Sequence, residues 1–291
     1  MAAHPSLREE RFRALSPDDD TFDDVLDRAL REDVGSGDIT TLALVAQGHS
    51  VKARICARTT GTVAGIGLTA RVFRLLDRTT RVIAHATDGA TVKAGDAIAE
   101  LEGDARSMLV GERVALNFLG LLSGIATTTA RYVDAVRGLG VRIASTRKTT
   151  PTLRALERYA VRAGGGYNHR AGLWDAVLIK DNHIAALGSI KAAVAAARSR
   201  VPAGTILEVE CDKAADVGEA LVAGVDAILL DNMELPQLRD CVALARDRAV
   251  IEASGGVTLE NVRAIASSGV DIISVGAITH GAPWLDIGMD L

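Results

Sequence analysis

The chain has 291 residues, of which 48% are hydrophobic and 24% charged, and its formal net charge is −4. This is the composition of an ordinary globular protein of one or two domains, and the negative charge gives no overall basic field for nucleic acid. The N-terminus is polar, without the apolar core of a signal peptide, and no run of about 18 apolar residues predicts a membrane span. Cys56, Cys211 and Cys241 match neither a zinc motif nor a disulfide framework. We expect a soluble cytoplasmic protein.

Positive charge is concentrated in one part of the chain. Residues 141–184 carry eight Lys or Arg against three acids, whereas the other residues carry 25 against 34. A basic segment in an acidic chain fits a small anionic ligand better than a polymer. Three of its arginines, Arg154, Arg158 and Arg162, have i, i+4 spacing, and we expect them on a solvated helix face.

The first predicted element is a helix. A loose arm is expected over residues 1–20, and the segment 21–38 then has Thr21 in the N-cap position, Asp24 in the capping-box position and Gly35 as a stop signal.

The next two segments differ in pattern. From about residue 50 to 102, Val, Ile and Thr alternate with polar residues between glycines, which predicts strands. Residues 104–138 predict helix, with a break near Ser123 and Gly124.

The second half of the chain has a regular rhythm of strands and helices. Six apolar, β-rich runs, VRIAST, AVLIKD, TILEVE, DAILLD, AVIEAS and DIISVG, are separated in most cases by Ala- and Leu-rich amphipathic stretches. Alternation at roughly 20–25 residues per unit predicts a parallel α/β domain. The runs are almost continuously hydrophobic, as expected for strands buried on both faces.

The strand ends favour a barrel over an open sheet. No GxGxxG follows the first strand, which argues against dinucleotide binding, and the glycine-bearing turns SGGVT and VGAIT come last, where a TIM-like barrel binds phosphate. A full barrel takes about 250 residues, and only some 155 are available. We therefore expect an incomplete barrel with a short extra strand near GYNHR.

Polar residues at the strand ends are the candidate site residues. Arg147 and Lys148 follow the first strand, where an Arg fork and a Lys point charge would meet a carboxylate or phosphate; the alternative is that they cap solvent-facing carbonyls. The glycine-rich loop GGGYNHR carries His169 and Arg170. LIKDNH ends in four polar residues, among them Lys180; one of the four, His183 being the first choice, is expected to satisfy only backbone groups.

Two carboxylates each close a strand. As neighbours, Glu210 and Asp231 could hold Mg²⁺ or ribose hydroxyls, because a hard cation prefers oxygen ligands; a salt bridge to Lys180 or Lys148 is the compatible alternative. Glu208 should point to the same side as Glu210, as layer packing or as a second ligand.

Backbone and outlying positions complete the set of candidates. The SGG and VGA turns fit backbone N–H cradles for phosphate. Read alone, Arg113 is a solvated helix residue. The segment DGATVKAGDAIAELEGD resembles the turn of biotinyl and lipoyl carrier domains, which would require a modified Lys93, but no MKM tripeptide surrounds that lysine. A structural hairpin is the better interpretation.

Several of these motifs together resemble one family. TRKTTPTLRALERYAVRAGGGYNHRAGLWDAVLIKDNHI, LEVE, ILLDN, EASGG and VDIISVGAITH occur in the order typical of quinolinate phosphoribosyltransferases (nicotinate-nucleotide pyrophosphorylase, carboxylating), and REDVGSGDITT near the N-terminus extends the likeness. The main part of the resemblance runs from Arg113 to His280. One departure is Thr152, where the family commonly has Gly.

The resemblance implies a fold, a domain division and an assembly. It implies an N-terminal α+β open-faced sandwich, residues 1–125, followed by an incomplete, seven-stranded parallel α/β barrel, residues 126–279, with residues 280–291 packing on the sandwich. It also implies a homodimer, with higher assembly possible, in which each sandwich covers the partner's barrel mouth. Arg113 would then reach the partner's site.

The implied reaction joins quinolinate to phosphoribosyl pyrophosphate and gives nicotinate mononucleotide, pyrophosphate and CO₂, with Mg²⁺ and no organic cofactor. A related enzyme acting on nicotinate or another aromatic acid is the alternative. The resemblance assigns catalysis to Lys148, Lys180, Glu210 and Asp231, the last two also as Mg²⁺ ligands. Substrate binding is assigned to these four and to Arg113, Thr146, Arg147, His169, Arg170, Ser254, Gly255, Gly256, Val275, Gly276 and Ala277. Neither nucleic acid nor membrane is an expected partner.

Overall fold

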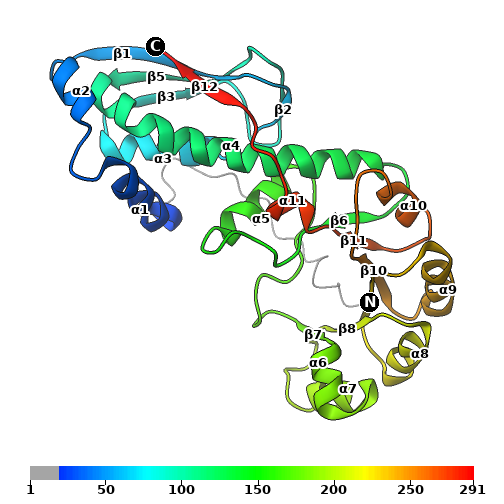
Figure 1. The fold of residues 1–291 in the computed structure, drawn as a ribbon. Coiled ribbons are helices and arrows are strands. Elements are labelled where there is room, and N and C mark those ends of the chain that lie inside the picture. The colour runs from blue at the N-terminus through cyan, green and yellow to red at the C-terminus, as the bar shows by residue number, and fades with distance from the viewer. Residues whose placement is uncertain (1–19) are drawn as a thin grey trace. The chain divides into compact units, whose positions relative to one another are not determined.

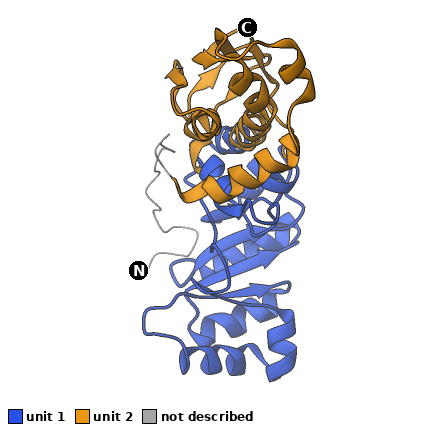
Figure 2. Ribbon diagram, turned by 90° about the vertical axis from the view of Figure 1, so that its left-hand side faces the viewer, with its two compact units in different colours: residues 1–10, 129–161, 165–281 blue, residues 11–128, 162–164, 282–291 orange. Residues whose placement is uncertain are grey.

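The computed structural model describes residues 20–291, which form two compact units (Figure 2). The barrel unit contains residues 129–161 and 165–281, and the sandwich unit contains residues 20–128, 162–164 and 282–291. The predicted loose arm lies outside the described residues, apart from Asp20. The predicted domain boundary after residue 125 and the boundary between the units both fall inside one long helix.

The sandwich unit is built on an antiparallel four-stranded sheet of order β12-β1-β5-β3 (Figure 1). The C-terminal strand thus pairs with β1, where Arg54 lies opposite Asp290. In chain order the elements are a 3₁₀ turn Asp20–Phe22, α1 Asp23–Val34, α2 Ile39–Leu44, β1 Ser50–Ala57, β2 Gly61–Thr62, α3 Ile66–Leu76, β3 Arg81–Ala84, β4 Thr91–Val92, β5 Ala97–Asp104, α4 Ala105–Ala135 and β12 Ile287–Asp290.

The alternation along β1 explains why this sheet has one open face. Ala53, Ile55 and Ala57 are buried, while Lys52 and Arg54, which alternate with them, are exposed. The exposed pair forms salt bridges across the strand pairing, to Glu102 and Glu100 of β5 respectively. One face therefore belongs to the core and the other carries these charged side chains toward solvent, as in an open-faced sandwich.

Three local predictions in the sandwich unit are wrong. Helix α1 begins at Asp23 after the 3₁₀ turn, and its N-cap is Phe22, so Thr21 does not cap it. The predicted strand region contains helix α3. Its first N–H groups, those of Gly65 and Ile66, donate to Asp88 at 3.0 and 3.1 Å, a cap too distant in sequence to be seen as a local signal.

The third difference is that α4 continues through the predicted break. Gly124 lies within the helix and does not end it. A side chain is excluded at this position, because a Cβ there would lie 2.2 Å from the carbonyl oxygen of Pro283. The glycine thus serves close packing. By length and composition α4 could also cross a membrane, but most of the relevant stretch is buried in the structure, as in the core helix of a globular protein.

The turn around Lys93 is not a hairpin. Strand β4 before it pairs with β2, whereas β5 after it pairs with β1 and β3, so the turn joins two different sheets. The Lys93 N–H donates to Asp96 at 2.8 Å, which closes the turn locally.

The barrel unit contains six parallel strands in the order β6-β11-β10-β9-β8-β7. All six predicted strand runs are confirmed. The strands are β6 Arg142–Ala144, β7 Val177–Ile179, β8 Leu207–Cys211, β9 Ala227–Asp231, β10 Val250–Ser254 and β11 Ile272–Ser274. The helices are α5 Arg154–Ala163, whose last residues belong to the sandwich unit, α6 Asp181–Leu187, α7 Ile190–Arg198, α8 Ala214–Ala223, α9 Leu235–Ala245, α10 Val262–Ala266 and α11 Ala277–His280.

The strand order is that of a barrel that does not close. The first strand, β6, lies beside the last, β11, as when a sheet curls round on itself. Tyr167 forms a single parallel bridge to Ala144 of β6 and takes the place of a second barrel strand between β6 and β7. In the described residues no ladder joins Tyr167 to β7. The predicted incomplete barrel is confirmed, with its seventh strand reduced to one bridge.

Candidate active site

The carboxyl ends of the parallel strands surround a cavity of about 650 Å³ in the barrel unit. Thirteen of the fifteen predicted site residues line it, and the exceptions are Arg113 and Val275. Carboxyl ends of parallel strands meet at one edge of a sheet, which is why residues spread over more than 130 positions converge there. The cavity holds cations from three loops and carboxylates from three strands.

Arg147 and Lys148 lie on the loop after β6, and both are exposed. The loop is held from two sides. The Lys148 N–H donates to Thr146 Oγ1 at 3.0 Å, and the Thr279 hydroxyl donates to the Lys148 carbonyl at 2.7 Å. The predicted alternative, that these cations cap solvent-facing carbonyls, is not what the structure presents, since both side chains line the cavity.

The loop carrying His169 and Arg170 is fixed by buried polar contacts. Arg158 donates to the His169 carbonyl at 2.5 Å, and the Asn168 amide donates to the Arg158 carbonyl at 3.0 Å. The expectation of a solvated face for Arg158 is therefore wrong: it is 9% exposed and supports the loop.

Arg154 is likewise drawn into the same region. Its guanidinium donates to Thr149 Oγ1 at 2.9 Å and to the Ala171 carbonyl at 3.0 Å. One face of α5 thus binds the loops on either side of it, because an arginine fork satisfies loop carbonyls that no strand or helix pairs.

Lys180 and Glu210 form a salt bridge across the cavity wall. Lys180 follows β7, and Glu210 lies near the end of β8. The predicted alternative for Glu210, pairing with Lys180, is thus confirmed. His183 accepts the Lys180 N–H at 2.9 Å and so caps α6, the backbone role expected for it.

Asp231 is the last residue of β9, and the next residue holds its carboxylate. The Asn232 amide donates to Asp231 Oδ2 at 2.7 Å, and the Asn232 N–H donates to the Ser254 carbonyl at 2.9 Å. Asn232 has φ +52°, a left-handed conformation that Asn tolerates better than most residues. A Cβ on Gly255 would lie 2.2 Å from Asn232 Oδ1, so the glycine makes room for this arrangement.

The two glycine turns, SGG and VGA, differ in backbone conformation and in which of their N–H groups are already hydrogen-bonded. Gly255 and Gly256 have φ +89° and +59°, consecutive positive values that suit a concave turn. In the second turn Gly276 and Ala277 line the cavity, but Val275 is 1% exposed and its N–H donates to the Ala144 carbonyl at 2.9 Å. The assignment of a phosphate-binding N–H to Val275 is therefore wrong, because the sheet uses that N–H.

Arg113 belongs to the sandwich unit and is not among the groups that line the cavity. It lies within α4, and its side chain is 65% exposed, with the nearest carboxylate oxygen, that of Glu112, 4.0 Å away. An exposed arginine in a largely apolar helix is a feature that the helix itself does not require.

The chain was compared with known proteins and structures. Residues 38–123 match the family description "Quinolinate phosphoribosyl transferase, N-terminal domain", and residues 125–290 match "Quinolinate phosphoribosyl transferase, C-terminal domain". The chain belongs to the quinolinate phosphoribosyltransferase family.

Individual relatives agree with this assignment. A probable nicotinate-nucleotide pyrophosphorylase [carboxylating] of Bacillus subtilis is 44% identical over 92% of this chain and 92% of its own length. The corresponding Mycobacterium leprae protein is 43% identical over 94% of this chain and 98% of its own. The crystal structure of NadC from Streptococcus pyogenes, 44% identical, superposes with a TM-score of 0.90 over 93% of this chain and 95% of that one.

Sequence reasoning missed three polar residues of this phosphoribosyltransferase cavity: Glu252, Ser274 and His280. A signal existed for Glu252, since an acid in the middle of the apolar run AVIEAS has no reason to be there unless it meets a partner. His280 lies at the end of α11, and a Cβ on Gly276 would lie 3.0 Å from its Nε2 and 3.3 Å from Lys148 Cδ. The position of His280 beside the cavity follows from the packing of this turn, for which the sequence gives no signal.

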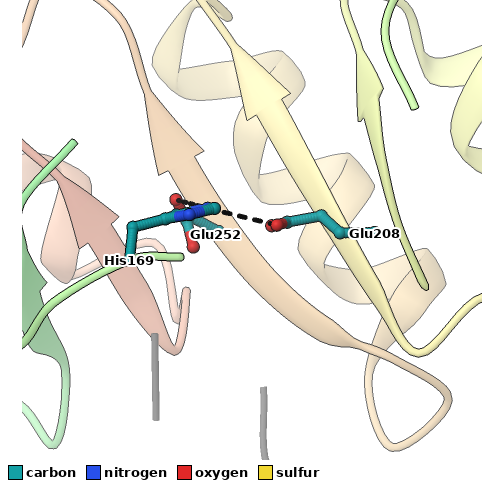
Figure 3. Close-up of side chains that lie close together, drawn as sticks. All are labelled: His169, Glu208 and Glu252. Carbon is teal, nitrogen blue, oxygen red and sulfur yellow. Dashed lines mark ion pairs between the residues drawn. The ribbon is translucent and has the colours of Figure 1, made fainter. Parts of the chain in front are cut away.

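Beneath the cavity, His169 meets two buried carboxylates (Figure 3). His169 Nε2 lies 3.2 Å from Glu208 Oε2 and 3.5 Å from Glu252 Oε1, and both glutamates are 0% exposed. Burial by itself lowers the pKa of His169, but the charge of Glu252 and the hydrogen bond and charge of Glu208 outweigh it and raise that pKa to about 9.

The same three side chains have the composition of a metal site, since their donor atoms lie within 4.8 Å of one another. In this structure His169 Nε2 meets both carboxylates directly, at 3.2 and 3.5 Å, so we describe the cluster as an ion-paired one. Burial and the charge of Arg147 lower the pKa of the adjacent Arg170, which is a second cation close to the same carboxylates.

A second cavity, of about 420 Å³, lies at the amino ends of the strands and includes Asp226 and Asp271. Both aspartates accept backbone N–H groups of neighbouring strands, from Leu207 at 2.7 Å and Ile251 at 2.8 Å. These carboxylates serve the sheet, and no ligand is needed to explain their positions. In a parallel barrel the amino-terminal face is the one associated with stability.

Replacing His169 by Gln should destabilise the protein in a pH-dependent way. The folded pKa of about 9 lies above the ordinary 6.5, so the charged His169 contributes fully below pH 6.5 and its contribution is lost as the pH rises through 9. The difference in Tm between the wild type and His169→Gln should therefore be largest below pH 6.5 and shrink above pH 9. Thermal unfolding across this range measures it, with His49→Gln, at an exposed position in the sandwich unit, as control. A Tm difference that does not vary with pH would contradict the charged assignment.

Proposed function

We propose that the chain transfers the phosphoribosyl group of phosphoribosyl pyrophosphate to quinolinate and releases pyrophosphate and CO₂. The observation that carries the proposal is the cavity itself, in which five predicted cations, Arg147, Lys148, His169, Arg170 and Lys180, face the carboxylates of Glu210 and Asp231. Cations are needed to bind a dianionic acid and a sugar diphosphate. Carboxylates are needed to stabilise the positive charge that develops at the anomeric carbon of the sugar. The names of the relatives support the same reaction.

The cations divide between the two substrates. Arg170 and Lys180 line the cavity and, with Arg147, would hold the carboxylates of quinolinate, because a guanidinium fork binds a carboxylate in bidentate fashion. Lys148 would neutralise the pyrophosphate as it leaves. Lys180 is already oriented by its salt bridge to Glu210.

Backbone groups would hold the 5′-phosphate. The turn at Gly255 and Gly256, with its positive φ values, and the turn at Gly276 and Ala277 follow the last two strands of the barrel. N–H groups in such turns bind phosphate without a charged side chain. This leaves the cations free for quinolinate and pyrophosphate.

Glu210 and Asp231 fit a Mg²⁺ ion by the chemistry of their donors. Both present carboxylate oxygens to the cavity from neighbouring strands, and Asn232 engages only Oδ2 of Asp231 by a hydrogen bond. Bound there, Mg²⁺ would neutralise charge on the diphosphate of the substrate. The two carboxylates themselves would hold the ribose hydroxyls and stabilise the positive charge that develops at the anomeric carbon.

Decarboxylation needs no further group from the protein. When the ring nitrogen of quinolinate bonds to the anomeric carbon, the C–O bond to pyrophosphate breaks and the nitrogen becomes cationic. The electron pair of the neighbouring carboxylate's C–C bond then moves into the ring as CO₂ departs, and a proton takes its place. The cavity's part is to hold the acid so that its nitrogen faces the sugar.

The active unit is proposed to be a homodimer with shared sites. Arg113 is exposed on α4 of the sandwich unit, and we propose that it reaches the partner's site. It would add one more cation for the diacid. We also assign the protein to the cytoplasm, in accord with its three free cysteines.

A turnover assay with quinolinate and nicotinate side by side tests the reaction. We expect product from quinolinate with one CO₂ per pyrophosphate, and little from nicotinate, because a monoacid leaves one cation of the cavity unpaired. Pyrophosphate release and ¹⁴CO₂ capture are the two measurements. Chelation should abolish turnover and Mg²⁺ should restore it. Faster turnover of nicotinate without CO₂ would favour the alternative enzyme.

Replacing Arg147 by Ala should weaken quinolinate binding. Arg147 is exposed in the unbound cavity, so the loss should lie near the lower end of the range for a charge pair, about 2 kcal/mol or roughly thirtyfold in KM. Steady-state kinetics with quinolinate varied provide the measurement. Arg200→Ala is the control, because Arg200 is an exposed arginine just after α7 that does not line the cavity. Equal quinolinate KM values for Arg147→Ala and the wild type would remove Arg147 from the acid pocket.

Co-expressing two weakened variants tests the shared site. Arg113→Ala and Arg147→Ala should each be weak alone at low quinolinate, but co-expression should restore activity, because half of the dimers would pair one of each and keep one intact site of two. Statistical assembly gives about a quarter of wild-type activity. Turnover of the unfractionated co-expressed protein at low quinolinate measures this. If Arg113 acted in its own chain's site, or had no role, the mixture would show only the average of the two variants.

A further inference from the structure

The strongest unexplained feature of the molecule is a pair of carboxylates inside the barrel. Glu208 of β8 and Glu252 of β10 are both 0% exposed, although acids are almost never fully buried without partners. They lie on strands separated by β9 and converge on one imidazole, that of His169. Neither carboxylate is needed by the reaction as proposed above.

The contacts of His169 favour its charged form. Two buried carboxylates, Glu208 and Glu252, lie 3.2 and 3.5 Å from one ring nitrogen, Nε2. Ser274 donates to Glu252 Oε1, which solvates that carboxylate but adds no charge. A buried imidazole that faces two carboxylates is stabilised as the cation, because opposite charges attract strongly where little water screens them.

The contacts of the ring nitrogens show how the cluster orients the imidazole. Nε2 points to the two carboxylates, and Nδ1 lies 2.7 Å from the Arg170 N–H. The Nδ1 contact by itself fits a neutral ring with its proton on Nε2, whereas the two carboxylates favour the cation. The two carboxylates decide between them, because their buried charges at 3.2 and 3.5 Å from Nε2 outweigh one backbone contact between adjacent residues.

We propose that Glu208 and Glu252 are positioning residues that hold His169 through Nε2 and keep it charged as part of the acid-binding cavity. The inference rests on the proposed function in assigning quinolinate as the acid. The second ring proton, on Nδ1, displaces the Arg170 N–H and becomes a donor in the cavity that His169 lines. A permanent cation at this point favours a diacid over a monoacid, and the buried carboxylates keep it charged at pH values where an ordinary histidine is neutral.

The test uses Glu252→Gln and Glu208→Gln, which keep the shape of the side chain and remove its charge. With histidine labelled by ¹³C and ¹⁵N, NMR titration of the intact protein follows the His169 resonance, which is assigned by its absence in His169→Gln. The wild-type pKa should lie near 9, and each variant should lower it to about 7 or below. The ¹⁵N shifts show whether Nδ1 carries the proton.

Kinetics distinguish positioning from mere stability. At pH 8 a histidine of pKa about 7 is only about one-tenth charged, so the ratio of quinolinate KM between Glu252→Gln and the wild type should be about ten at pH 8. At pH 6 the same ratio should be close to one, and the KM for phosphoribosyl pyrophosphate should change little at either pH. A structural defect would raise KM equally at both pH values.

A third buried glutamate provides the matched control. Glu157 of α5 is also 0% exposed, but its carboxylate accepts the Thr150 N–H at 3.1 Å instead of facing His169. Glu157→Gln should leave the His169 pKa and the pH dependence of KM unchanged.

Two results would overturn the proposal. One is a wild-type His169 pKa near 6.5, and the other is a pKa or KM ratio that Glu252→Gln and Glu157→Gln affect alike. Loss of the His169 signal on adding Zn²⁺, with gain of a bound ion, would show a metal site instead. Because the titration is made without substrate, it decides the charge of His169 even if wild-type protein fails to turn over quinolinate, which would count against the proposed function alone.

Discussion

The compensation of charge at one end of the barrel is the constraint on which the rest of the site depends. A cavity that gathers Arg147, Lys148, Arg170 and Lys180 in one place repels itself unless carboxylates lie among the cations. The structure supplies them from the strands and not from the loops: Glu210 pairs with Lys180, and Glu208 and Glu252 pair with His169. Because the strands are rigid, Lys180 and His169 are held at fixed positions by partners that cannot move away.

Some features of the barrel and its cavity could be predicted from the sequence, and others could not, because only some of them leave a pattern in the residue order. Alternating apolar runs and helices predicted all six strands, because burial of both faces leaves a direct trace in composition. Polar residues at strand ends predicted most of the cavity, because parallel strands bring those ends together. Contacts between distant segments leave no such trace: Asp88 capping α3, Pro283 against Gly124 and Arg158 on the His169 carbonyl all had to be seen in the structure.

Backbone conformation explains two positions, Thr152 and Val275, that could not be interpreted from residue type alone. Thr152 stands where the resemblance to the family led us to expect glycine, and it has φ +70°, a value that glycine adopts without strain and a β-branched residue adopts only at a cost. This chain therefore makes the turn before α5 with a strained residue. Val275 shows the opposite case, in which a position suited to a phosphate cradle by pattern gives its N–H to the sheet.

The cations of the cavity are not equivalent, and their burial indicates how they divide the work. Arg147 and Lys148 are exposed, so water and salt screen their charges before a ligand arrives. His169 and Arg170 are 6% and 8% exposed, and their interactions with an acid would be screened much less. The exposed pair is suited to attracting two anionic substrates and to releasing pyrophosphate, whereas the buried pair is suited to telling one acid from another. Discrimination requires a desolvated charge that a wrong ligand leaves unpaired. His169 and Arg170 provide such charges beside Glu208 and Glu252, which make their burial tolerable.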